Sequence, residues 1–386
     1  MDFQQILAEL VATQTDPHTR ARQWKSANQG TVIAHLLPDV PEEIIHASGA
    51  LPLAVTGVDR GTSLAESHIP SFICSLLRNP LEMALRRELD FIDGMVIPYV
   101  CDSTRAFSQV WEANFPDLFN HTLWLPKKVS GDSAKQFLFS EFMRLKKRLE
   151  VFLGREITDQ SLRHAIGVYN QNRRLLRRLF ALRKKGRIPL PYADYLSVVK
   201  ASMTMPREDH NTLLARLLEG LKEECRPCEK EESVRVFLLG SLGEPHSVLT
   251  LFDELGMDVV DDHFYDGTRC FLQDVDEAVD PMEGLVSRQL SKAPLSGFHY
   301  QDDRWRQYLL DRVRDGQIEG VVYFPLMYCD PMEFDYPLIK GLLGEMGIPV
   351  LFLETDFHSG SLGQVRTRLE AFAEMLREKK DESLPC

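Results

Sequence analysis

The fold is decided by a stretch in the last third of the chain, Val322-Tyr323-Phe324-Pro325-Leu326-Met327-Tyr328-Cys329-Asp330-Pro331. It is an apolar, β-prone run that ends abruptly in Cys-Asp and is followed by a helical pattern. The same pattern occurs earlier, in Met95-Val96-Ile97-Pro98-Tyr99-Val100-Cys101-Asp102. In an open α/β sheet the carboxyl end of a strand faces the ligand crevice. We therefore predict that two thiols, one from each half of the chain, contribute to a shared metal centre.

Apolar runs alternate with helical patterns on both sides of a helical middle region. Strands are expected at residues 31–37, 51–55, 91–100, 122–126, 234–239, 257–260, 320–326 and 349–354. Apolar residues at helical spacing predict helices at 3–24, 138–152, 162–185 and 205–221. The order predicts an α/β protein with two related parallel-sheet domains of the Rossmann or flavodoxin-like kind, joined by helices. The expected domains are residues 1–130, 131–232 and 233–386, with the metal centre in the crevice between the two sheets.

Composition limits the possible partners and location. The chain has 386 residues, 44% of them apolar, and a formal net charge of −12. This charge disfavours nucleic acid as the main partner. No apolar run approaches the length that spans a bilayer, and Met1 is followed by a polar amphipathic segment, so we expect a cytoplasmic protein without a membrane partner.

The cysteines are the first candidates for chemistry. Seven are present, too few and too irregularly spaced for a disulfide scaffold in a chain this long. Cys74, Cys101 and Cys329 lie in apolar contexts at expected crevice ends, and their soft sulfur suits zinc or an iron–sulfur cluster. Their spacing matches no local zinc or ferredoxin motif, and the alternative is that each is a small buried hydrophobe. Cys225 and Cys228 have CxxC spacing but lie in a charged linker without a second pair.

Other polar residues lie close to expected strand ends. Glu42 and His46 follow the first strand, a position suited to acid–base chemistry, although helix capping and core packing are the alternatives. Arg105 follows Cys101 and is the candidate substrate contact. A basic run over 173–185 is either a solvated helix face or a surface that binds an anionic ligand. The insertion at 273–315 has no recognisable motif. The chain contains no GxxxxGK[ST] phosphate loop, so any ATP hydrolysis belongs to another chain.

Several segments, in order along nearly the whole chain, resemble the 2-hydroxyacyl-CoA dehydratase / benzoyl-CoA reductase family. They are 41–52 (PEEIIHASGALP), 71–75 (SFICS), 101–105 (CDSTR), 329–337 (CDPMEFDYP) and 363–372 (GQVRTRLEAF). Within that family the chain looks most like the smaller, C-type subunits of ATP-dependent benzoyl-CoA reductases, on the segments 22–25 (RQWK), 115–117 (FPD) and 168–176 (VYNQNRRLL).

The resemblance implies a cofactor and partners. Cys74, Cys101 and Cys329 would bind one [4Fe-4S] cluster whose fourth iron is not held by cysteine. A homologous B-type sister subunit would carry its own cluster. Separate ATP-hydrolysing iron–sulfur activator subunits, supplied by ferredoxin, would deliver electrons one at a time.

The implied reaction is the one-electron reduction of the ring of benzoyl-CoA to a cyclic diene. The alternatives are a ketyl-radical (R)-2-hydroxyacyl-CoA dehydratase subunit, and a non-catalytic electron-relay subunit whose sister performs the chemistry. Ring reduction needs protons, and His46 is the candidate proton donor because histidine titrates near neutrality.

Overall fold

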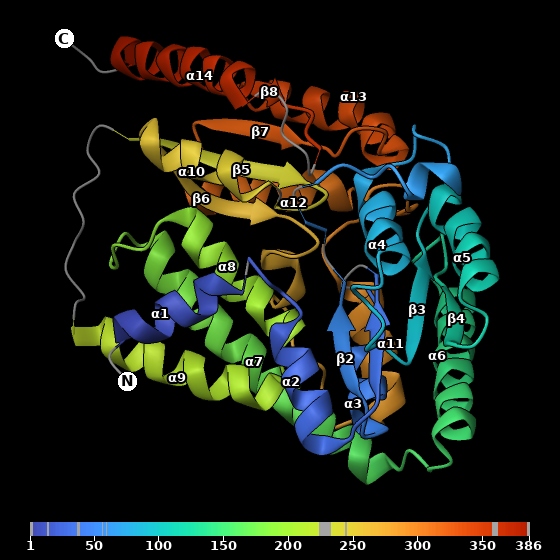
Figure 1. The fold of residues 1–386 in the computed structure, drawn as a ribbon. Helices are drawn as coiled ribbons and strands as arrows, with labels where there is room; N and C mark the ends of the chain where they lie inside the picture. Colours follow the sequence, from blue (N-terminus) through green and yellow to red (C-terminus); the bar gives the residue numbers. More distant parts are fainter. Residues whose placement is uncertain are drawn as a thin grey trace.

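The computed structural model describes residues 3–13, 15–36, 39–55, 57–58, 60–223, 233–243, 245–356 and 362–383. Within them the chain forms two parallel four-stranded sheets and many helices (Figure 1). The α/β class predicted from the alternation of apolar runs and helical patterns is confirmed.

The first sheet has the strand order β2-β1-β3-β4, and all its strands are parallel. Its strands are β1 (Val32–His35), β2 (Leu51–Ala54), β3 (Gly94–Tyr99) and β4 (Phe119–Trp124). The two faces are buried separately. One packs against α4 (Ser75–Leu85) and α5 (Asp102–Asn114), and the other against α3 (Glu42–Ala47) and α6 (Asp132–Leu153).

The second sheet repeats this arrangement with the order β6-β5-β7-β8, again fully parallel. Its strands are β5 (Val234–Gly240), β6 (Met257–His263), β7 (Gly320–Phe324) and β8 (Val350–Phe352). Helices α10 (His246–Glu254) and α14 (Leu362–Ser383) cover one face, and α12 (Arg304–Gly316) and α13 (Asp330–Glu345) cover the other. Both sheets therefore have the 2-1-3-4 order with which the flavodoxin-like arrangement begins, as expected for two related units.

The middle of the chain is helical, as predicted, but it contains a helix that periodicity missed. Helices α7 (Asp159–Lys184) and α9 (Arg207–Glu223) match the predicted pair. Between them lies α8 (Tyr192–Thr204), in which nearly every residue is buried. A helix that is enclosed on all sides needs no apolar stripe, so its sequence carries no helical period.

The single helix expected over 3–24 is wrong. The structure has two helices there, α1 (Phe3–Ala12) and α2 (Thr19–Asn28). Pro17 disfavours helical geometry at Asp16. The Asp16 carboxylate instead accepts hydrogen bonds from Thr19 Oγ1 at 2.5 Å and from the His18 amide at 3.3 Å, so the chain turns between the helices.

The insertion after β6 contributes to both halves of the molecule. The 3-10 turn η2 (Thr268–Cys270) precedes this insertion, which contains α11 (Pro281–Ser291) and most of α12. Helix α11 packs against α6 and α7, on the side of the first sheet, and buries Met282, Leu285 and Val286 there. A further 3-10 turn, η1 (Ala65–Ser67), precedes α4. Residues 224–232, with Cys225 and Cys228, lie outside the described residues.

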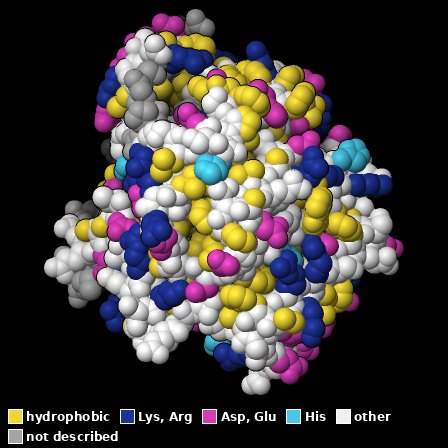
Figure 2. Space-filling view, turned by 45° about the vertical axis from the view of Figure 1, so that its right-hand side comes forward, with side chains coloured by type: hydrophobic (Ala, Val, Ile, Leu, Met, Phe, Trp, Pro, Cys, Tyr) yellow, Lys and Arg dark blue, Asp and Glu magenta, His cyan; other side chains and the backbone are white. Residues whose placement is uncertain are grey.

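Basic and acidic side chains are intermixed on the face of the molecule drawn in Figure 2. None of the helices in the described ranges is long and apolar enough to span a bilayer.

Candidate functional site

Each of the three candidate cysteines immediately precedes a helix. Cys74 is the N-cap of α4, Cys101 of α5 and Cys329 of α13. A helix begins with unsatisfied backbone N–H groups and a partial positive charge, which favour an anion at that end. The three thiols are therefore placed where the backbone stabilises negative charge.

The fold brings these three thiols together. Cys74, Cys101 and Cys329 line one cavity, although they come from both halves of the chain. Val100 and Leu326, which follow β3 and β7, also line it. The cavity therefore lies where strands of the two sheets end.

Burial and mutual proximity perturb the thiols. Burial raises the pKa of Cys74 well above the usual range, and the negative charges that Cys329 and Cys101 would carry raise it further. Burial also raises the pKa of Cys329 to about 11, although the Ser241 hydroxyl and the Met332 amide oppose this. Three thiolates that line one cavity are unfavourable together without a compensating positive charge, and the donor set fits a cationic group bound by sulfur.

Sequence reasoning missed several polar neighbours of the thiols. Ser241 Oγ, after β5, lies 3.5 Å from Cys329 Sγ. Lys127, after β4, donates to the Val100 carbonyl, and its ammonium lies 4.4 Å from the ring centroid of Phe298. Both residues follow strand carboxyl ends, so the rule that identified the cysteines could also have found them.

Asp39 is a further lining residue that the sequence did not single out. Its carboxylate is 1% exposed, and it lies 2.8 Å from Arg269 and 3.3 Å from Lys292. The charges of Arg269 and Lys292 hold the pKa of Asp39 well below its usual range despite its burial. A buried carboxylate thus connects the wall of the cysteine cavity to two cations, Arg269 of η2 and Lys292 of the insertion.

The described part of the chain contains no group of three His, Cys, Asp or Glu side chains arranged to hold a single metal ion. The thiols share a cavity wall rather than a single-ion coordination sphere. The iron–sulfur cluster therefore stays a prediction.

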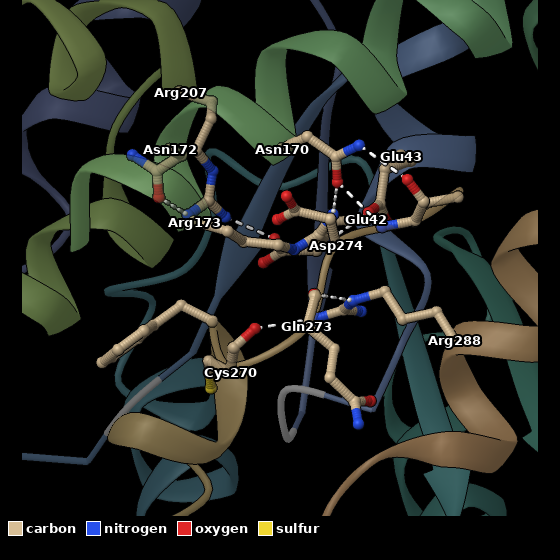
Figure 3. Close-up of polar contacts among 12 residues, drawn as sticks. Glu42, Glu43, Asn170, Asn172, Arg173, Arg207, Cys270, Gln273, Asp274 and Arg288 are labelled. Atoms are coloured by element: carbon tan, nitrogen blue, oxygen red, sulfur yellow. Dashed lines mark hydrogen bonds and ion pairs between the residues drawn. The ribbon is translucent and has the colours of Figure 1, made fainter. Parts of the chain in front are cut away.

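Glu42 lies in a different place, a buried network of ionic and polar groups between α3 and the helical region (Figure 3). Its carboxylate accepts a hydrogen bond from His35 Nε2 at 2.9 Å and pairs with Arg207. Burial alone would raise the pKa of Glu42, but Arg207 and His35 hold it below its usual value. Next to it, Glu43 pairs with Arg173, whose guanidinium also donates to Asn170 Oδ1 at 2.8 Å.

His46 and Arg105 are also outside the cysteine cavity. His46 Nε2 lies 2.8 Å from Glu208 Oε1 of α9, and its imidazole is edge-on to Tyr169 of α7 at 5.7 Å. Arg105 has a side chain that is 53% exposed and lies 3.7 Å from Asp102. The structure therefore brings the three predicted cysteines together and places the other three candidates outside their cavity. Glu42 and His46 contact neighbouring residues of α9, and Arg105 is exposed.

Comparison of the sequence with known proteins identifies the family. Residues 39–376 match the family model described as "2-hydroxyglutaryl-CoA dehydratase, D-component". The chain belongs to this family, which confirms the resemblance to 2-hydroxyacyl-CoA dehydratases and benzoyl-CoA reductases.

Characterised relatives cover nearly the whole chain. The C-type subunit of benzoyl-CoA reductase from Thauera aromatica is 31% identical over 98% of this chain and 99% of its own length. The (R)-phenyllactyl-CoA dehydratase beta subunit of Clostridium sporogenes is 30% identical over 87% of this chain and 89% of its own. The beta subunit of (R)-2-hydroxyglutaryl-CoA dehydratase from Acidaminococcus fermentans is 27% identical over 97% of this chain and 100% of its own. All three are subunits of larger enzymes that act on CoA thioesters.

Proposed function

We propose that this chain is the C-type subunit of a benzoyl-CoA reductase and binds a [4Fe-4S] cluster through Cys74, Cys101 and Cys329. The complex would reduce benzoyl-CoA to cyclohexa-1,5-diene-1-carbonyl-CoA with electrons from ferredoxin. One observation carries the cluster assignment: three cysteines distant in sequence, each at a helix N-terminus, line a single cavity. Similarity to the Thauera aromatica protein over 98% of the chain supports the reductase assignment.

The cluster would supply single electrons at low potential. The residues around it control its surroundings. The apolar side chains of Leu76, Val100 and Leu326 keep water away from the thiols, and excluding water protects a radical reaction from side reactions. The N-termini of the three helices and the hydroxyl of Ser241 offset the negative charge of the thiolates.

The proposed complex contains a homologous B-type sister subunit, ATP-hydrolysing iron–sulfur activator subunits and ferredoxin as the upstream donor. Large exposed aromatic side chains beside the cysteines support a docking surface at this end of the molecule. Phe72, Tyr328 and Phe334 are 68%, 42% and 83% exposed. They lie close in sequence to Cys74 or Cys329, and exposed aromatic groups are typical of interfaces.

A second candidate is a subunit of an (R)-2-hydroxyacyl-CoA dehydratase, in which the same electron would drive loss of a hydroxyl group. It is favoured by the match to the dehydratase family model and by dehydratase beta subunits at 27–30% identity. A third is an electron-relay subunit whose sister binds the substrate. One observation favours this third candidate: Glu42 and His46, the two residues proposed for acid–base chemistry, do not line the cysteine cavity.

Iron analysis of anaerobically purified protein tests the cluster. Wild-type protein should contain about four irons per chain, as expected for a [4Fe-4S] cluster. Cys101→Ser and Cys329→Ser should lose the cluster and its visible absorption. Cys270→Ser is the matched control, because Cys270 is also a free cysteine but does not line this cavity. Full iron content in either cavity variant would remove that residue from the ligand set.

Substrate turnover separates the three candidates. The complete complex should consume benzoyl-CoA with ATP and a strong reductant, and should leave (R)-2-hydroxyacyl-CoA thioesters unchanged. The opposite substrate preference would identify a dehydratase. The isolated chain should show neither ATPase activity nor ring reduction, since it has no phosphate loop.

A further inference from the structure

The insertion that carried no sequence motif forms one wall of a second, strongly basic cavity. This cavity has a volume of about 400 Å³ and lies between η2, α11 and α12. Its lining includes a single carboxylate, Asp311, against five cationic side chains: Arg269, Arg288, Lys292, Arg304 and Arg312. A volume of this size is within the usual range for small-molecule sites.

Arg288 is the cation whose charge is least balanced. Its guanidinium donates hydrogen bonds to the backbone carbonyls of Cys270 at 2.7 Å and Gln273 at 2.9 Å (Figure 3). Among the described residues it forms no ion pair with a carboxylate. Desolvation, followed by the charge of Arg173, lowers the pKa of Arg288 to about 9. The charges of Glu43 and Asp39 oppose this lowering only in part, so Arg288 is the lining cation with the weakest carboxylate partner.

Positive charge also exceeds negative charge around Arg269 and Lys292, which line the same cavity. Arg269 and Lys292 share the carboxylate of Asp39, whereas Arg312 pairs with Asp261 and Arg304 with Asp302. Among the described residues, the three lining cations Arg269, Lys292 and Arg288 therefore have one ion-paired carboxylate between them. Buried charges without a counter-ion are costly, so an anion with two negative charges would stabilise this arrangement. Guanidinium groups suit phosphate in particular, because their planar donors match its oxygens.

The basic cavity shares a wall with the cysteine cavity. Ala293 and Pro294 line the basic cavity, and the next two residues, Leu295 and Ser296, line the cysteine cavity. Asp39 also lines the cysteine cavity and pairs with two cations of the basic one. A CoA thioester has anionic phosphates at its nucleotide end and the reactive thioester at the other end. The basic cavity suits the phosphates, and the adjoining cysteine cavity suits the thioester.

We propose that the cavity lined by Arg269, Arg288, Lys292, Arg304 and Arg312 binds the phosphate groups at the nucleotide end of a CoA thioester. The thioester would then be directed toward the cavity of Cys74, Cys101 and Cys329. The choice of CoA rests on the proposed function, whereas the preference for a phosphate anion rests on the charges of the cavity itself.

The test is calorimetric titration of the full chain, purified anaerobically, with coenzyme A. Arg304→Gln and Arg288→Gln should each weaken binding at least about tenfold, the scale of one lost charge-assisted hydrogen bond. Arg306→Gln is the matched control: Arg306 lies on the same helix as Arg304 but pairs with Glu345 at 2.7 Å and does not line the cavity. Thermal unfolding checks that each variant is folded. Because Arg304 is 30% exposed and holds no buried acid, its variant should fold even if Arg288→Gln does not.

Three ligands distinguish the source of the phosphate. Dephospho-CoA should bind more weakly than coenzyme A if the 3′-phosphate is recognised. ADP and inorganic phosphate should bind more weakly still. Binding of ADP as tight as that of coenzyme A would overturn the CoA assignment. Absence of coenzyme A binding to the folded chain, or equal binding by both variants and the wild type, would overturn the site.

Failure of this site and failure of the proposed function give different results. If the variants bind coenzyme A normally while the complex reduces benzoyl-CoA, the site is wrong and the function stands. If coenzyme A binding depends on Arg304 but the complex neither reduces benzoyl-CoA nor dehydrates a hydroxyacyl-CoA, the site stands and the function is wrong.

Discussion

The hydroxyl oxygen of Ser241 lies 3.5 Å from the sulfur of Cys329, although 88 residues separate them in the sequence. Ser241 follows β5 and Cys329 follows β7, and these two strands pair directly in the second sheet. The contact therefore results from the parallel topology, which brings the carboxyl ends of neighbouring strands together.

This contact predicts an effect on redox potential. A hydrogen bond to a cluster ligand stabilises the more negative, reduced state. Ser241→Ala should therefore lower the midpoint potential, by about 40 mV if the bond contributes about 1 kcal/mol. Potentiometric titration followed by electron paramagnetic resonance measures this. Iron content should be unchanged, and Ser108→Ala, whose hydroxyl bonds only the Arg105 carbonyl, should leave the potential unaltered. An unaltered potential in Ser241→Ala would mean that the hydroxyl does not bond the ligand.

Measuring the turnover and the stability of His46 variants separately distinguishes a proton relay from a structural contact. If His46 relays a proton, His46→Gln should keep its iron and lose ring reduction by roughly a hundredfold, the usual scale for a general acid. If the contact with Glu208 is structural, His46→Gln and Glu208→Gln should instead destabilise the fold non-additively, with turnover unchanged. Because His46 is bonded to Glu208 and does not line the cysteine cavity, we expect the second result. A large loss of turnover in the folded variant would instead support a role of His46 as a proton relay.

The pair between Glu43 and Arg173 predicts a large stability effect. Their side chains are 3% and 7% exposed. Removing one partner of a buried pair leaves an uncompensated charge, so Glu43→Gln should lower the free energy of unfolding by roughly 3 kcal/mol. Urea unfolding measures the loss. Glu283→Gln, which removes an exposed pair with Lys135 at 3.4 Å, should cost less than about 1 kcal/mol. Similar losses in the two variants would show that the Glu43 pair is not buried in solution.

Asp262 predicts a stability that depends on pH. Burial, and then the charge of Asp261, raise the pKa of Asp262 from 3.8 to about 7. Between these values the folded state keeps a proton that the unfolded state has lost, so stability falls as the pH rises from about 4 to 7. Asp262→Asn removes this penalty, and its Oδ1 can still accept the amides of Phe264 and Thr268, now at 3.2 and 2.8 Å. The variant should be more stable by roughly 4 kcal/mol at pH 8, with the gain vanishing near pH 4. A gain that is equal at both pH values would contradict a raised pKa.

The α/β class, the parallel sheets and the positions of Cys101 and Cys329 after strands could be predicted from the sequence. Strands buried on both faces must be continuous apolar runs, and a Cys-Asp after such a run marks a strand end. These patterns are local, so they can be recognised in the sequence alone. Helix α8 was not predicted because it is buried on all sides. Its sequence therefore lacks the apolar stripe from which an amphipathic helix is recognised.

Which polar residues come into contact depends on the tertiary structure. Glu42 and His46 follow the same strand as Asp39, yet Asp39 lines the cysteine cavity while Glu42 pairs with Arg207 and His46 contacts Glu208. Glu42 and His46 are one helical turn apart, so they lie on the same face of α3 and contact neighbouring residues of α9. Asp39 precedes the helix and lies against Arg269 and Lys292 instead. The basic cavity could not be predicted from the sequence either. Its cations line one space only because η2, α11 and α12 pack together. The sequence specifies which charges are present, but their balance depends on which groups the fold buries together.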